Sequence, residues 1–239
     1  IVAAAGITER DQVLEIGPGL GSLTRQLAQR AGRVVAVELD GRFLPILQTE
    51  LAEHDNVELV HGDILDQDTA DLFQGPYKVV ANVPYYITGA ILRHLLGGGH
   101  KPSLMVLTVQ KEVAQRITAV PPHMSLLSVS VQYYGQVEIP FTIKAGAFWP
   151  RPDVDSAVVR IDLSTHLADD LTQEQDFFRV VRVGFSQKRK QLQKNLRQLN
   201  LSKIEITTAL DRAGIDGKRR AEILSINEWR TLVRALKID

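Results

Sequence analysis

The sequence predicts a doubly wound α/β sheet followed by a smaller all-helical domain. Short apolar runs that read as strands begin near residues 13, 34, 57, 79 and 104, and helical stretches separate them. Strands that alternate with helices in this way are typical of βαβ units packed into one sheet. From Thr172 onward the apolar periodicity is almost purely helical. We therefore expect two domains, residues 1–163 and residues 164–239.

The first βα unit carries a glycine-rich turn. Val13–Ile16 reads as a strand, Gly17-Pro18-Gly19-Leu20-Gly21 follows at once, and a helix is expected from about Ser22 to Ala31. Glycines let the backbone turn sharply and approach a ligand at the carboxyl edge of a sheet. A dinucleotide fingerprint would carry Gly or Ala where this chain has Ser22, which weakens a nicotinamide dehydrogenase as an alternative without excluding it.

Acidic residues follow the second and third strands. The run Val34–Val37 ends in Glu38, whose two carboxylate oxygens suit a pair of ribose hydroxyls. The run Val57–Val60 leads to Asp63, which can accept a hydrogen bond from an adenine amino group, and to Ile64, which can pack on the ring. The structural alternatives are that Glu38 caps the next helix and that Asp63 makes a turn.

The fourth strand, Val79–Ala81, leads into Asn82-Val83-Pro84-Tyr85-Tyr86. An exocyclic amine on a base ring is a poor nucleophile because its lone pair is delocalised into the ring. The Asn82 side-chain carbonyl and the backbone carbonyl before or at Pro84 can accept its N–H groups, while the Tyr85 ring can stack on the base. The structural alternative is a strand-to-helix turn that Pro84 stiffens, with the two tyrosines as half-buried packing residues.

Later runs extend the sheet. Ser103–Val109 reads as the fifth strand, and Gly97-Gly98-Gly99 before it is typical of a helix-ending loop. Leu126–Tyr133 and Val137–Lys144 predict an antiparallel pair at the sheet edge, and Ala157–Ile161 predicts a last strand.

Three further signals concern helices. Pro45 lies inside the second helical run and predicts a kink there. The capping-box patterns Thr172-x-x-Gln175 and Ser225-x-x-Glu228 predict helix starts in the second domain.

The glycine loop, the two acids and Asn-x-Pro-Tyr follow four successive strands in that order, which is the layout of S-adenosylmethionine methyltransferases. Five segments make the likeness specific: Glu15–Gly21, Asn82–Gly89, Gln110–Ala114, Phe148–Ser156 and Ser186–Lys190. Through them the chain resembles the ribosomal RNA adenine N6,N6-dimethyltransferases, and within that family it is most similar to the bacterial small-subunit (16S) type linked to kasugamycin resistance. The resemblance covers nearly the whole chain.

The resemblance implies a Rossmann-like doubly wound sheet of the methyltransferase type, with residues 1–163 catalytic and 164–239 a basic RNA-binding domain. It implies that Asn82 and the Pro84 carbonyl hold the target amine, and that Tyr85 and Phe148 cover the two faces of the target adenine. It implies that the glycines line the methionine part of S-adenosylmethionine, with Glu38 on the ribose and Asp63 and Ile64 on the adenine. The full expected cofactor set is Glu15, Gly17, Gly19, Gly21, Glu38, Leu39, Asp63, Ile64 and Asn82.

The implied reaction is the double methylation of two adjacent adenosines in a loop near the 3′ end of small-subunit rRNA, within a pre-ribosomal particle. We expect direct in-line transfer to N6 of an unstacked base, with no general base and no metal. Family members also carry an amino-terminal arm with a Gln-Asn-Phe type motif that closes over the cofactor. The printed sequence opens at Ile1, inside the helix expected after that arm.

Charge is divided unevenly along a chain whose net charge is zero. Residues 1–175 hold 13 Lys and Arg against 21 Asp and Glu, whereas residues 176–239 hold 15 against 7. A basic cluster of Lys188, Arg189, Lys190, Lys194 and Arg197 is expected along about three turns of one helix. Such a cluster is usually a solvated helix face. Because the net charge of this part of the chain is opposite in sign to that of residues 1–175, we favour phosphate contacts. Lys111 and Arg116, on the helix after the fifth strand, are expected to extend the track.

The remaining composition excludes several classes of protein. The absence of cysteine excludes disulfides and thiolate metal sites. No apolar run approaches the roughly 20 residues that span a bilayer. We expect a cytoplasmic protein with no membrane partner, and a monomer, because no sustained apolar heptad is present.

Two alternatives share much of the pattern. The erythromycin-resistance methylases of large-subunit rRNA have the glycine loop, the Asn-x-Pro-Tyr type motif and the Phe-x-Pro segment; Tyr86-Ile87-Thr88-Gly89 argues against them. A non-catalytic ribosome assembly factor would use the same RNA surface, and this role can coexist with catalysis.

Overall fold

The computed structural model describes residues 1–164 and 171–236, with side chains from residue 173 onward in the second range. Its contacts divide the chain into two compact units, Ile1–Ala114 with Gly135–Thr165 and Gln115–Tyr134 with His166–Asp239. This division assigns residues 115–134 to the same unit as the carboxyl-terminal helices. The domain boundary expected at residues 163 and 164 stays a prediction.

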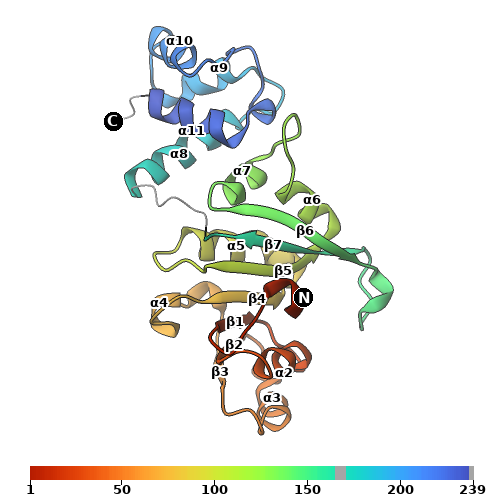
Figure 1. Cartoon of the computed structure of the whole chain (residues 1–239). Helices are drawn as coiled ribbons and strands as arrows, with labels where there is room; N and C mark the ends of the chain where they lie inside the picture. Colours follow the sequence, from red (N-terminus) through yellow and green to blue (C-terminus); the bar gives the residue numbers. More distant parts are fainter. Residues whose placement is uncertain (165–170, 237–239) are drawn as a thin grey trace. The chain divides into compact units, whose positions relative to one another are not determined.

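The first unit contains a seven-stranded sheet in the order β3-β2-β1-β4-β5-β7-β6 (Figure 1). Its strands are β1 (Gln12–Ile16), β2 (Arg33–Glu38), β3 (Val57–His61), β4 (Lys78–Asn82), β5 (Leu104–Gln110), β6 (Gln136–Ile143) and β7 (Ser156–Asp162). Strands β1 to β5 run parallel, whereas β7 is antiparallel to both β5 and β6. The α/β fold class and the five parallel strands are confirmed.

The core lies along the middle strands. Leu104 to Val109 of β5 are all buried, as expected for a strand covered on both faces. Helix α2 contributes Leu27 to the same apolar cluster as Val13 and Val34 of β1 and β2. A rigid central sheet therefore carries the loops at its carboxyl edge.

One predicted strand is a helix. Leu126–Gln132 forms α7, although its alternating Ser and Val residues suit a strand. Ser125 and Ser128 form a capping box: Ser125 Oγ accepts the Ser128 N–H at 3.2 Å, and Ser128 Oγ accepts the Ser125 N–H at 2.6 Å. The cap and the burial of Val129 and Val131 favour the helix over β propensity. Strand β6 consequently pairs with β7 and not with residues 126–133.

The first unit has mostly short helices. They are α1 (Val2–Ala5), α2 (Ser22–Ala28), α3 (Leu44–Glu50), α4 (Thr69–Leu72) and α5 (Thr88–Gly97), with the 3-10 turns η1 (Ile64–Asp66), η2 (Tyr85–Ile87) and η3 (Ala145–Ala147). Helix α6 (Lys111–Ile117) contains the unit boundary at Ala114. The triple glycine ends α5 as predicted. The predicted kink at Pro45 is wrong, because this residue lies in the first turn of α3, where its missing N–H leaves no bond unmade.

The described part of the second unit is helical, which was predicted for its carboxyl-terminal residues but not for α7. Its elements are α7, α8 (Leu171–Gly184), α9 (Leu192–Asn195), η4 (Leu196–Leu199), α10 (Lys203–Arg212), η5 (Ala221–Ile223) and α11 (Ile226–Ala235). The capping box of Ser225 and Glu228 is confirmed at the start of α11. The side chain of Thr172 lies outside the described residues. Trp229 is fully buried against Gly184, where a Cβ would collide with the indole ring.

Candidate active site at the carboxyl edge of the sheet

Most of the predicted site residues of the first unit lie at or just after the carboxyl ends of parallel strands, and the glycine loop and Asn82 belong to β1 and β4, which lie side by side. Strand β1 pairs with β2 on one side and with β4 on the other, so the chain reverses its direction of winding between β1 and β4. Ligands of doubly wound sheets bind at such a switch point, outside the carboxyl ends of the strands. The glycine loop follows β1, and Asn82 is the last residue of β4.

The glycine loop has a backbone that other residues adopt with strain. Gly17, Gly19 and Gly21 have φ values of 66°, 56° and 79°, in the left-handed region that favours glycine. A Cβ built on Gly17 or Gly19 would meet nothing within 4 Å, so space beside the loop is open. At Gly21 a Cβ would come within 3.1 Å of Leu47 Cδ2. The first two glycines therefore face open space, and the third permits close packing on α3.

Glu38 connects the end of β2 to this loop. Its side chain is only 6% exposed; one carboxylate oxygen accepts the Gly19 N–H at 3.0 Å and the other accepts the Asp40 N–H at 2.9 Å. Both a structural and a ligand-binding role fit, because a carboxylate offers about four acceptor sites and two remain.

Glu15 is buried at the end of β1 with an unsatisfied oxygen. Its side chain is 1% exposed, and among the described residues its Oε2 has no hydrogen-bond partner. Burial raises the pKa of Glu15 to about 7, and the negative charge of Glu38 acts in the same direction. A buried acceptor without a partner, beside the open glycine loop, suits a ligand that brings a cationic or N–H group.

The predicted adenine-binding residues lie after β3. Asp63 caps η1 through a 2.9 Å hydrogen bond from the Leu65 N–H to its Oδ1, which is the turn-forming role weighed as the alternative. Its Oδ2 makes no hydrogen bond among the described residues and can still accept one from a ligand. Ile64 is buried, while Leu39, after β2, is 60% exposed.

Asn82 presents an anchored amide. Its side chain is exposed, and its Oδ1 accepts the hydroxyl of Thr108 at 2.7 Å. Asn82 and Thr108 are register partners on β4 and β5. The Pro84 carbonyl accepts the Ile87 N–H at 3.2 Å. Each of these two carbonyl oxygens keeps one lone pair for a ligand.

Tyr85 begins η2 and is partly buried. Its phenol oxygen lies 2.6 Å from Ser156 Oγ, and Ser156 is fully buried at the start of β7. Neither Thr108 nor Ser156 was predicted from the sequence as a site residue. A hydroxyl inside the apolar run Leu104–Val109 is the signal by which Thr108 could have been found.

Phe148 follows η3 in the loop between β6 and β7 and is partly exposed. Asp155 holds this loop, since its carboxylate accepts the Ala145 N–H and the Lys144 ammonium, each at 3.0 Å. The Ala145 hydrogen bond, followed by the bond from Lys144, lowers the pKa of Asp155. The loop that carries Phe148 is therefore tied to the start of β7.

The basic cluster was expected along one helix, but the structure spreads its residues over a turn and two short helices. Lys188, Arg189 and Lys190 lie in the turn after α8, Lys194 lies in α9 and Arg197 in η4. The helix stops at Gly184, where Asn195 Nδ2 donates to the Gly184 and Gln187 carbonyls at 2.6 and 3.2 Å and thereby stabilises the turn. All five cations are exposed, and none forms an ion pair with another described residue.

Lys111 and Arg116 are exposed on α6, as predicted. Lys111 belongs to the first unit and Arg116 to the second. Their contribution to a track shared with the basic cluster stays a prediction.

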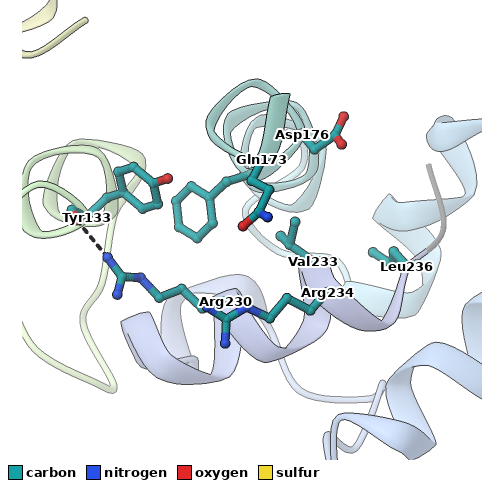
Figure 2. Close-up of a pocket in the computed structure, with 8 residues that line it drawn as sticks. Tyr133, Gln173, Asp176, Arg230, Val233, Arg234 and Leu236 are labelled. Carbon is teal, nitrogen blue, oxygen red and sulfur yellow. Dashed lines mark hydrogen bonds between the residues drawn. The ribbon is translucent and has the colours of Figure 1, made fainter. Parts of the chain in front are cut away.

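The second unit holds a pocket that the sequence reading did not predict. Tyr133, Gln173 and Arg230 help to line it (Figure 2). Arg230 donates to the Tyr133 carbonyl at 3.0 Å and lies over the Tyr133 ring, 5.1 Å from its centroid. This contact connects α11 to the residue after α7 within the unit, so we assign it a packing role.

Between residues 1 and 164 and between 171 and 236, no three His, Asp or Glu side chains gather as a metal site requires. No helix in these two ranges is long and apolar enough to cross a membrane.

The sequence pattern that defines the ribosomal RNA adenine dimethylase family matches residues 1–237. The chain belongs to this family. It is accordingly an S-adenosylmethionine-dependent methyltransferase of Rossmann-like fold that dimethylates adenine in ribosomal RNA.

Individual relatives agree with the family assignment. The chain is 45% identical over 235 residues to ribosomal RNA small subunit methyltransferase A of Dehalococcoides mccartyi (strain CBDB1), covering 97% of this chain and 81% of that protein. It is 42% identical over 236 residues to the protein of the same name from Clostridium botulinum (strain Kyoto / Type A2), covering 97% and 86%.

Solved structures show the same fold over the whole length. A dimethyladenosine transferase from Plasmodium falciparum aligns with a TM-score of 0.83 and 25% identity, over 97% of this chain and 91% of that one. The 23S rRNA methyltransferase ErmE aligns with a TM-score of 0.79 and 28% identity, over 98% and 94%. The family fold thus includes both the sheet and the helical second unit.

Proposed function

We propose that this adenine dimethylase transfers methyl groups from S-adenosylmethionine to N6 of two adjacent adenosines in a loop near the 3′ end of small-subunit (16S) rRNA, twice at each, during ribosome biogenesis. The observation that carries the proposal is Asn82, whose anchored amide oxygen lies at the end of β4, beside the strand that bears the glycine loop. Such a pair of neighbouring sites suits an amine acceptor and a methyl donor.

The donor site fits S-adenosylmethionine in charge and in space. Gly17 and Gly19 leave room beside the backbone, and Glu15 offers an unsatisfied oxygen to a cationic ligand. We assign the ribose to Glu38, which keeps two acceptor sites, and the adenine to Asp63 Oδ2 and Ile64. The cofactor supplies an activated methyl group on a positively charged sulfur.

The acceptor site is built for a flat amine. The Asn82 and Pro84 carbonyls accept the two N6–H groups, and Tyr85 and Phe148 stack on the ring. The methyl passes in line from sulfur to N6: the S–C bond breaks, the N–C bond forms, the cofactor leaves as a neutral thioether, and the acidic nitrogen loses its proton to water. A general base is not needed for this step.

The second unit is proposed to bind phosphates. Lys188, Arg189, Lys190, Lys194 and Arg197 are exposed cations in turns and short helices, and Lys111 and Arg116 are proposed to extend the surface. Such contacts position the RNA without reading its sequence. The names of the relatives favour the small subunit, and a reaction on small-subunit rRNA agrees with the expected cytoplasmic location.

The test is methyl transfer from tritiated S-adenosylmethionine to undermethylated small subunits, with large subunits assayed in parallel and nucleosides analysed afterwards. We expect N6,N6-dimethyladenosine at two adjacent positions of small-subunit RNA, and much slower transfer by the Asn82→Ala variant. Transfer only to large subunits would move the target to 23S rRNA, the substrate named for the aligned ErmE structure. Binding without transfer would favour the assembly-factor role.

A further inference from the structure

Thr108 is a buried hydroxyl in an otherwise apolar central strand. It is 2% exposed, and the other residues from Leu104 to Val109 carry apolar side chains. A valine would fill the same volume without the hydroxyl, so packing alone does not account for threonine there. The hydroxyl donates to Asn82 Oδ1 at 2.7 Å.

Ser156 is likewise a buried hydroxyl beside an acceptor-site residue, in this case Tyr85. Its side chain is 0% exposed, and its Oγ lies 2.6 Å from the phenol oxygen of Tyr85. Because β7 is antiparallel to β5, its first residue pairs with Gln110 at the end of β5. The start of β7 and the ends of the parallel strands therefore meet at one edge, where Ser156 contacts the phenol oxygen of Tyr85.

We propose that Thr108 and Ser156 are positioning residues for methyl transfer, and that they matter most for the second methyl group. This inference rests on the proposed function. Thr108 fixes the Asn82 amide so that the remaining lone pair of Oδ1 points to the target amine. Ser156 holds the phenol end of Tyr85 and hence the position of the ring on which the base stacks.

The dependence on the second methyl follows from counting N–H groups. Unmodified adenine N6 has two, one for the Asn82 carbonyl and one for the Pro84 carbonyl. After the first transfer only one N–H remains, so a single hydrogen bond and the stacked ring must orient the nitrogen. Loss of rigidity in either acceptor-site residue then costs more in the second transfer than in the first.

The test compares Thr108→Val with Thr108→Ser, which keeps the hydroxyl, in single-turnover assays at saturating cofactor and undermethylated small subunits. For Thr108→Val we expect the second transfer to slow roughly tenfold, monomethyladenosine to accumulate, and cofactor affinity to stay within about twofold. Thr108→Ser should resemble the wild type. Thr69→Val is the matched control, because it removes a buried hydroxyl that donates to the His100 carbonyl at 2.8 Å.

Double variants separate positioning from a general loss of stability. Thr108→Val should add little to Asn82→Ala, and Ser156→Ala should add little to Tyr85→Phe, since each pair acts through one hydrogen bond. Circular dichroism and thermal unfolding establish whether each variant folds. If Thr108→Val does not fold, Ser156→Ala still tests the proposal independently.

Wild-type rates and product ratios in both Thr108→Val and Ser156→Ala would overturn the inference while leaving the proposed function intact. Fully additive effects within both pairs would overturn it as well. A wild-type protein that binds cofactor and makes no methyladenosine would overturn the proposed function itself, and the positioning roles with it.

Discussion

The carboxylate of Glu38 accepts the backbone N–H of Gly19 at 3.0 Å, so the end of β2 holds the glycine loop that follows β1. The same carboxylate accepts the Asp40 N–H with its other oxygen. One acidic side chain thus shapes the loop and, in the proposed function, takes the ribose. Neither task can be removed without disturbing the other.

We predict that Glu38→Gln weakens S-adenosylmethionine binding by at least about tenfold. The amide nitrogen that replaces one oxygen cannot accept a backbone N–H, which leaves a donor unpaired. Isothermal titration calorimetry measures the loss. Asp40→Asn is the control at the same strand end, since the Asp40 carboxylate pairs with Arg42 and not with the loop; equal losses in both variants would contradict the role of Glu38.

We predict that the contribution of Glu15 to the free energy of unfolding decreases as pH rises from about 4.5 to about 7. Its folded-state pKa is raised to about 7, so the unfolded chain loses this proton first and the stabilising contribution present at low pH disappears across that window. The upper bound of the effect is about 3 kcal/mol. Urea unfolding of the wild type and Glu15→Gln at pH 5 and pH 8 should show the difference, and parallel pH dependences would refute it.

The same carboxyl should couple cofactor binding to protons. A cationic ligand beside Glu15 favours the ionised form, so we expect proton release on binding and a cofactor affinity that increases as pH rises through about 7. Titrations in buffers of different ionisation enthalpy measure the protons released. Glu15→Gln should release none, and equal release from both proteins would assign the proton to another group.

We predict that Asn82→Ala reduces the methyl-transfer rate by on the order of 10² or more, because it removes the hydrogen bond from the target amine to the Asn82 carbonyl, which strengthens as the amine reacts. It also leaves the buried Thr108 hydroxyl without its acceptor, at about 1 kcal/mol of folding free energy. Single-turnover rates and urea unfolding measure the two effects separately. A rate near that of the wild type would sink the assignment of Asn82.

We predict that replacing Lys188, Arg189 and Lys190 by alanine weakens binding to small subunits and makes log affinity less dependent on log salt. The slope should fall by about one unit for each phosphate that the variant no longer neutralises. Filter binding at salt concentrations from about 50 to about 200 mM measures both effects. The control replaces Lys203, Arg212 and Lys218, three exposed cations of the same unit outside the cluster. Equal weakening in the two triple variants would show a general charge effect and no defined surface.

Local structure was predicted well where neighbouring residues decide it and poorly where they do not. The strands β1 to β5 follow from apolar runs within single βα units. The run Leu126–Gln132 has the alternation of a strand, yet the Ser125 cap and burial within the second unit make it a helix. The basic cluster was expected on one helix, yet Asn195 ties down a turn that begins at Gly184.

The sequence by itself determined the succession of strands and helices along the chain up to β5, the glycine loop, the Asn82 segment and the family, because each is carried by motifs of residues close together in the chain. Only the tertiary structure decided what holds the acceptor site. Thr108 lies 26 residues from Asn82, and Ser156 lies 71 residues from Tyr85. The strand order β4-β5-β7 brings these residues together, and that order arises from pairing between distant segments that local periodicity does not encode.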